Sequence, residues 1–82
     1  MNNENHEAWR EYAAAMTGPT ISLADATRLV KCAGITISDE FLGAGIQEGK
    51  FPFGFAIRGK EWRYWISLPK LVAWLRDWSG DA

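Results

Sequence analysis

The sequence contains few of the residues that build disulfides or metal sites. Its 82 residues include one cysteine, Cys32, and one histidine, His6. A single cysteine excludes an internal disulfide and a multi-cysteine zinc site. Because free cysteines are among the most often buried residues, we expect Cys32 to be a small apolar residue on a helix. The sequence therefore predicts neither a metal nor another cofactor.

Long hydrophobic runs and a signal sequence are lacking as well. No apolar run approaches the ~20 residues that are needed to cross a bilayer. The first five residues, MNNEN, are polar and acidic, unlike the start of a secretory signal peptide. We therefore expect a cytoplasmic protein that makes no contact with a membrane.

Groupings of residues that carry out catalysis are also missing. The sequence has no Ser-His-Asp grouping, no glycine-rich loop of the kind that holds phosphate, and no metal-ligand spacing. His6 lies in a polar segment with no partner in view. Asp39 and Glu40 fit either the first turn of a helix, where the helix dipole favours negative charge, or a catalytic pair. We expect the helix turn, and hence a non-enzymatic protein with no small-molecule substrate.

The residues that are present suffice for one small folded domain, residues 1–82. Hydrophobic residues make up 48% of the chain and five are tryptophan, which is too much for a disordered chain. The net charge is −1, without the strongly basic footprint that nucleic-acid-binding proteins usually have. Positive charge gathers in residues 51–67, where Arg58, Lys60 and Arg63 stand against one carboxylate, Glu61.

Glycine and proline divide the chain into four helical segments and one hairpin. We expect an extra N-terminal helix within residues 1–18, two helices joined by a short turn in 21–50, a hairpin in 53–66 and a C-terminal helix in 67–79. Three serines are expected to cap helices, since each precedes an amphipathic pattern: Ser22, Ser38 and Ser67. Trp9 and Tyr12 lie on one stripe of the first helix, which either covers the core or forms a dimer contact.

A two-residue turn at Gly59-Lys60 predicts the register of the hairpin, because glycine at the first central position is typical of a type II′ turn. This register places six apolar residues on one face: Phe53, Phe55, Ile57, Trp62, Tyr64 and Ile66. The opposite face is mostly polar or small, and on it Trp65 would cover Gly54 across the strands. We therefore expect the first face to be buried and the charged tip to be exposed.

The order of helix, turn, helix, Gly-Lys, hairpin and helix in residues 21–75 resembles the excisionase and MerR-type winged helix-turn-helix family of phages and mobile elements. Four segments carry the resemblance, residues 23–30, 46–52, 63–66 and 71–75: LADATRLV, IQEGKFP, RYWI and LVAWL. The resemblance implies a small α+β fold, mostly α, with about four helices and one two-stranded hairpin as its wing.

The resemblance further implies binding of double-stranded DNA, in transcription regulation or in DNA recombination beside a recombinase or polymerase. In this family the second motif helix enters the major groove and the wing contacts the backbone. The matching DNA-binding candidates here are Ser38, Gln47, Lys50, Arg58, Lys60 and Arg63. The chain departs from the family at four outward helix positions, which hold acidic or small residues: Asp39, Glu40, Gly43 and Ala44. Carboxylates repel phosphates, so the acidic residues at these positions argue against DNA binding by this helix.

That departure leaves a second hypothesis open, a protein-interaction module on a winged-helix scaffold that has lost its DNA face. The partner would bind the Gly43-Ala44-Gly45 stretch, the acidic helix start or the tryptophan-rich ends. Self-association fits either hypothesis. The candidate partner contacts are aromatic: Trp9, Tyr12, Trp65, Trp74 and Trp78.

Overall fold

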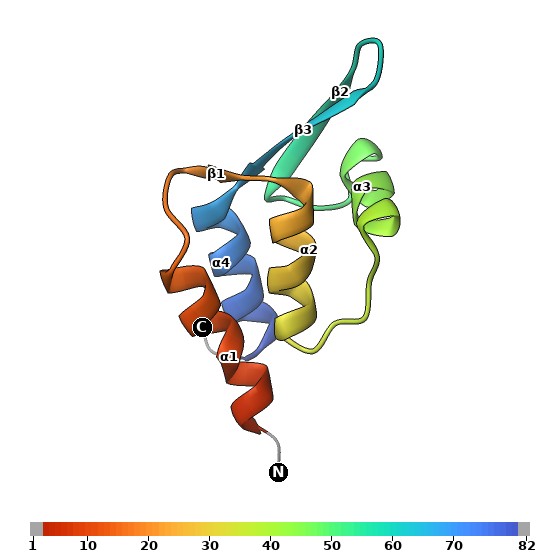
Figure 1. Cartoon of the computed structure of the whole chain (residues 1–82). Helices are drawn as coiled ribbons and strands as arrows, with labels where there is room; N and C mark the ends of the chain where they lie inside the picture. The colour runs from red at the N-terminus through yellow and green to blue at the C-terminus, as the bar shows by residue number, and fades with distance from the viewer. Residues whose placement is uncertain (1–2, 81–82) are drawn as a thin grey trace.

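Figure 1 shows the computed structural model of the chain, which describes the backbone of residues 3–80 and the side chains of residues 8–80. Within that part, four helices and three strands follow one another as α1 Asn3–Ala14, β1 Thr20–Ile21, α2 Leu23–Cys32, α3 Asp39–Gln47, β2 Gly54–Arg58, β3 Trp62–Ser67 and α4 Leu68–Trp78. The prediction of a small α+β fold with four helices is confirmed. The side chain of His6 lies outside the described residues.

All three predicted serine caps are confirmed. The hydroxyls of Ser22, Ser38 and Ser67 accept hydrogen bonds from backbone N–H groups three residues further along the chain: Asp25, Phe41 and Lys70. Each bond satisfies one of the N–H groups that the first turn of a helix leaves without a partner. Helix α2 is followed by Gly34 at φ +96°, a conformation that glycine adopts without the strain of a side chain.

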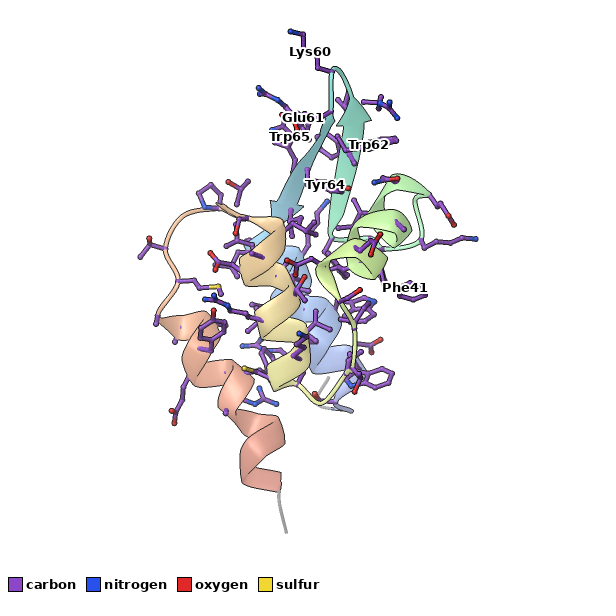
Figure 2. All side chains as sticks on the ribbon, turned by 45° about the vertical axis from the view of Figure 1, so that its right-hand side comes forward. Phe41, Lys60, Glu61, Trp62, Tyr64 and Trp65 are labelled. Atoms are coloured by element: carbon purple, nitrogen blue, oxygen red, sulfur yellow. The ribbon has the colours of Figure 1, made fainter. Side chains whose placement is uncertain are left out.

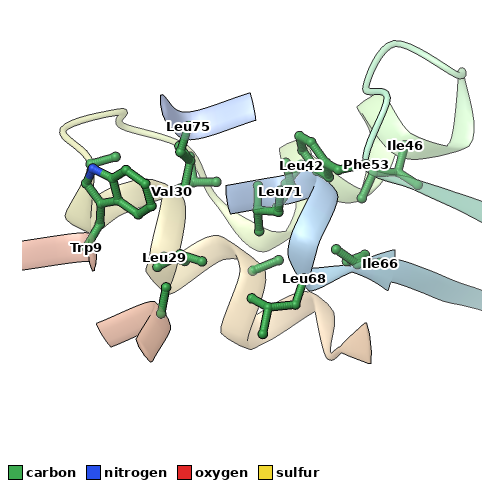
Figure 3. Packing of buried hydrophobic residues seen from close by; sticks show 13 residues of the cluster. Trp9, Leu29, Val30, Leu42, Ile46, Phe53, Ile66, Leu68, Leu71 and Leu75 are labelled. Carbon is green, nitrogen blue, oxygen red and sulfur yellow. The ribbon is translucent and has the colours of Figure 1, made fainter. Parts of the chain in front are cut away.

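One hydrophobic cluster joins side chains from all four helices and from the base of the sheet (Figure 3). Its largest fully buried members are Trp9, Phe53, Leu29, Leu42, Ile46, Ile66, Leu71 and Leu75. Of the two roles considered for α1, the structure shows that it covers the core, because Trp9 is 1% exposed. Trp78, in the last turn of α4, is 58% exposed. Cys32 is partly buried against the cluster.

The sheet has three antiparallel strands in the order β1-β3-β2, one strand more than the predicted hairpin. The additional strand, β1, pairs Thr20 with Ser67 and Ile21 with Ile66. Two residues are too few to show the alternation by which a strand is recognised in a sequence. Strand β1 joins the connection between α1 and α2 to the base of the hairpin.

The predicted register of the hairpin is wrong by one residue. Phe55 pairs with Trp65 and Ala56 with Tyr64, and the strands are joined by three residues, 59–61. Gly59 lacks the positive φ that a type II′ turn requires. Phe55 and Ile57 consequently face solvent and are each 56% exposed, although the predicted register buries them.

The physical reason for the shift is that only the base of the hairpin meets the rest of the protein. The hairpin extends beyond the helices, and the molecule measures 45 × 24 × 20 Å (Figure 1). No core lies beneath the outer half of the strands, so segregating apolar residues there gains no burial. The register follows instead from Ile66, which is buried completely and also pairs with β1.

Candidate nucleic-acid interface

The hairpin arm, defined as residues 54–67, carries most of the large apolar side chains that the described part of the chain exposes. Four of the six are on the arm: Phe55, Ile57, Trp62 and Trp65. The other two, Phe41 and Trp78, lie on α3 and α4. Exposed apolar patches of this kind mark interaction sites in soluble proteins. The arm is therefore the first candidate for a functional surface.

The two faces of the arm differ in composition. The face towards α3 carries Ala56, Arg58, Trp62 and Tyr64, whereas the opposite face carries Phe55, Ile57, Arg63 and Trp65. On the first face, the Arg58 guanidinium lies 5.8 Å from the centre of the Trp62 ring. On the second, the rings of Phe55 and Trp65 stack with centroids 5.4 Å apart and planes 14° apart.

The three basic residues predicted to contact DNA from the arm are all exposed, but they do not share one face. Arg58 and Arg63 project on opposite faces, and Lys60 lies in the connecting loop, at the far end of the arm (Figure 2). Glu61 is the one acidic residue of the arm. The arm thus presents positive charge on both faces and at its tip.

Helix α3 lies against the base of the arm and is joined to it by a hydrogen bond. The Gln47 side-chain amide donates to the Tyr64 hydroxyl of β3, and both side chains are partly buried. Gln47, predicted to contact DNA, therefore has an intramolecular partner. Lys50 is exposed just beyond the C-terminal end of α3, and Ser38 is at the other end, where its hydroxyl accepts the N–H of Phe41.

The glycines of α3 accommodate aromatic rings of the protein itself. A Cβ atom on Gly43 would lie 2.9 Å from the Tyr64 hydroxyl, and one on Gly45 would overlap the Phe51 ring. Gly43 is buried, so the prediction that it points outward is wrong. Gly43 and Gly45 therefore pack against Tyr64 and Phe51, while Ala44 between them is partly exposed.

The exposed part of α3 is acidic and apolar. Asp39 and Glu40 face solvent in its first turn, where the helix dipole favours negative charge. Phe41, beside them, is 72% exposed, and it points away from the body of the molecule (Figure 2). This end of α3 suits a protein surface better than the phosphates of DNA.

Three of the five aromatic candidates for partner contacts pack within the molecule: Trp9 in the core, and Tyr12 and Trp74 partly buried. The half-buried Tyr12 side chain of α1 raises the pKa of Arg28 on α2, and the Asp25 carboxylate raises it further. Trp74 packs edge-on against Phe53, with ring centroids 5.3 Å apart. Of the five candidates, Trp65 and Trp78 are the exposed ones.

Sequence reasoning missed a groove on the Phe55 face of the arm, which we call the Trp65 groove. It has a volume of about 250 Å³ and is lined by Thr20, Pro52, Phe53, Gly54, Phe55, Trp65, Ser67 and Lys70. The predicted register hid it, because that register placed Phe55 and Trp65 on opposite faces. The one clue in the sequence was Lys70, a cation in the first turn of the helix that directly follows β3.

Other classes of site find no support in the described part of the chain. Residues 3–80 contain no cluster of three or more His, Cys, Asp or Glu side chains that could hold a metal ion. None of the helices that the structure describes is both long and apolar enough to cross a bilayer. Comparisons with protein-family models, with curated proteins and with solved structures gave no match.

Proposed function

We propose that this chain is a non-enzymatic DNA-binding protein of the winged helix-turn-helix type, in which the hairpin arm is the wing and supplies most of the contact with duplex DNA. The observation that carries the proposal is the arm itself. It projects from the body, and its three cations, Arg58, Lys60 and Arg63, stand against the single carboxylate of Glu61. Affinity for duplex DNA comes largely from neutralising phosphates, and the arm is the region of the chain best suited to that.

The apolar residues near the tip extend this proposal to the minor groove. Ile57 and Trp62 are exposed beside Arg58 and Lys60. Proteins that bind the minor groove combine basic residues with apolar side chains that wedge between base pairs. In our proposal the cations follow the two phosphate backbones while Ile57 and Trp62 lie in the groove between them.

Helices α2 and α3 take the place of the helix-turn-helix, but α3 has a smaller part than its counterpart in the resembled family. Its start carries the exposed carboxylates of Asp39 and Glu40, so close approach of this end to phosphates is unfavourable. Lys50, at the end of α3 nearer the arm, is its candidate phosphate contact. Such a protein would act as an accessory factor beside a recombinase or a polymerase, as an excisionase or a small regulator does.

The experiment that tests the proposal measures binding of mixed-sequence duplex DNA at low salt by fluorescence anisotropy. The Arg58→Glu/Arg63→Glu variant is compared with a matched control, Lys31→Glu/Arg76→Glu, which changes the net charge equally on exposed sites of α2 and α4. We expect the arm variant to lose binding and the control to keep most of it. Circular dichroism verifies that both variants are folded.

The salt dependence of binding gives a second measure. Each phosphate contact contributes about −0.9 to the slope of log K against log salt concentration, so removing one cation should flatten the slope by about that amount. We expect this for Arg63→Gln and not for Arg76→Gln. Absence of duplex binding by the wild type at low salt would overturn the proposal. Equal losses of duplex affinity in the arm variant and the control would mean that the arm does not make the main contact with DNA.

A second candidate function is a protein-interaction module, and one specific observation favours it. Phe41 is 72% exposed directly after Asp39 and Glu40, a combination that DNA would repel and a basic, apolar protein surface would accept. Under this hypothesis the Phe41→Ala change abolishes co-purification of a recombinase or polymerase partner and leaves duplex binding unchanged. Under the DNA hypothesis alone, Phe41→Ala has no effect on either.

A further inference from the structure

The Trp65 groove differs from the tip of the arm in shape and chemistry. It is concave and lies where the base of the arm meets the N-terminal end of α4. Ser67, the N-cap of α4, and Lys70, in its first turn, both line it. A groove of about 250 Å³ is smaller than the pockets of drug-sized ligands, which are roughly 300–1,000 Å³, and suits one planar ring system.

The walls of the groove are aromatic. The stacked rings of Phe55 and Trp65 stand on one side of it, with Phe55 56% and Trp65 39% exposed. A cross-strand pair of stacked rings leaves aromatic surface on which another flat ring can stack. The groove therefore offers stacking surface that no part of this chain covers among the described residues.

The charge of the groove selects for an anion. Among the described residues that line it, Lys70 is the one charged residue, and no carboxylate is present. Arg63 projects from the same face of the arm as Trp65, and the positive end of the α4 dipole adds to the potential. An aromatic platform beside basic side chains is the arrangement with which proteins hold single-stranded nucleic acids.

We propose that the Trp65 groove binds an unpaired base of single-stranded DNA, with the base extending the Phe55–Trp65 stack and its phosphate contacting Lys70. Arg63 would contact a neighbouring phosphate. The choice of DNA as ligand rests on the proposed function, and the site shares Arg63, but neither the aromatic rings nor Lys70, with the surface that would bind the duplex. The protein would then hold duplex DNA with the tip of the arm while capturing a strand that has been opened next to it.

The test uses the intact chain and a fluorescent oligothymidylate of about ten nucleotides, within the usual range of site sizes. We expect Trp65→Ala to weaken single-strand binding about tenfold, since stacking of a base on an aromatic ring is typically worth that much or more. Trp65→Phe keeps an aromatic ring and should retain most of the affinity. The matched control is Trp78→Ala, which removes an exposed tryptophan in the last turn of α4, outside the groove. Lys70→Gln should weaken binding and reduce its salt dependence.

A direct readout is the NMR signal of the Trp65 indole N–H, assigned as the tryptophan signal missing in Trp65→Phe. We expect it to shift on addition of the oligothymidylate. Equal weakening by Trp65→Ala and Trp78→Ala, or an unshifted Trp65 signal, would overturn the groove assignment. Binding of duplex without single strands would overturn the groove and leave the proposed function in place. If the protein binds single strands, Trp65→Ala weakens that binding and no duplex is bound, the groove is supported and the proposed duplex function is overturned.

Discussion

The side-chain amide of Gln47 donates a hydrogen bond to the hydroxyl of Tyr64, and this bond joins the last turn of α3 to the hairpin arm. Gly43, one turn earlier on α3, lies against the same hydroxyl, so the tyrosine fits between the two positions. Tyr64 therefore contributes to the position of the arm relative to α3. Two substitutions test this contribution.

The Tyr64→Phe change should destabilise the protein by about 1 kcal/mol, because it removes the acceptor of Gln47 and leaves a partly buried amide without that partner. Urea denaturation followed by circular dichroism measures the free energy of unfolding. A double-mutant cycle with Gln47→Ala isolates the pair. If the two single changes add without any coupling, the hydrogen bond has no part in holding the arm.

The Gly43→Ala change should destabilise the protein by about 1 kcal/mol. Replacing glycine by alanine inside a helix usually has the opposite effect and stabilises by about 1 kcal/mol. A Cβ at Gly43 would lie 2.9 Å from the Tyr64 hydroxyl oxygen and 3.3 Å from a methyl carbon of Leu23. Ala44→Gly, in the same helix, is the control that reports the ordinary helix propensity. In the Tyr64→Phe background the cost of Gly43→Ala should fall, and an unchanged cost there would contradict the proposed clash.

The helices of this protein can be predicted from the sequence because their signals are local. Ser22, Ser38 and Ser67 each precede a pattern of apolar residues spaced as on one helix face, and each proves to be an N-cap. The buried stripe of α2 follows from the same spacing, and Ala26, Leu29 and Val30 are all buried. Strong local signals of this kind do not depend on the rest of the fold.

The register of the hairpin and the candidate groove could not be predicted, because they depend on contacts between distant segments. Grouping all the apolar residues of the hairpin on one face assumes that a core lies beneath the whole length of both strands. Here the core lies beneath the base alone, and β1, too short to recognise, pairs with Ile66 and Ser67 there. The shift of one residue turns Phe55 and Ile57 outward, so these side chains are exposed on the arm instead of buried in the core.

The register can be tested by the energetic coupling between aromatic side chains. Phe55 and Trp65 are direct partners with stacked rings, so a double-mutant cycle of the two alanine variants should give a coupling of about 0.5–1.5 kcal/mol. A cycle of Phe55→Ala with Tyr64→Ala should give much less, since Tyr64 projects from the other face of the arm. If Phe55 couples with Tyr64 and not with Trp65, the observed pairing is wrong and the register with a two-residue turn is correct.

The capping role of Ser38 can be separated from a role in DNA binding. Ser38→Ala should reduce the free energy of unfolding by about 1 kcal/mol, whereas Ser38→Gly should cost only a few tenths, because glycine leaves the first turn open to water. Denaturation measures both. If the hydroxyl serves the helix alone, both variants bind duplex DNA as tightly as the wild type under conditions in which they are folded. A loss of affinity common to both, with the fold intact, would assign Ser38 a contact with DNA as well.

The tryptophans at the two ends of the chain should respond to substitution in opposite ways. Trp9 is 1% exposed in the core, and Trp9→Ala should cost about 3–5 kcal/mol, a large part of the stability of a small domain. Trp78 is 58% exposed and stacks on Trp74 with centroids 6.4 Å apart, so Trp78→Ala should cost less than about 1 kcal/mol. Thermal unfolding compares the two, with Trp9→Phe as the milder core control. A stability cost of Trp78→Ala equal to that of Trp9→Ala would mean that Trp78 is buried between copies of the chain. Size-exclusion chromatography of the folded Trp78→Ala variant then examines self-association.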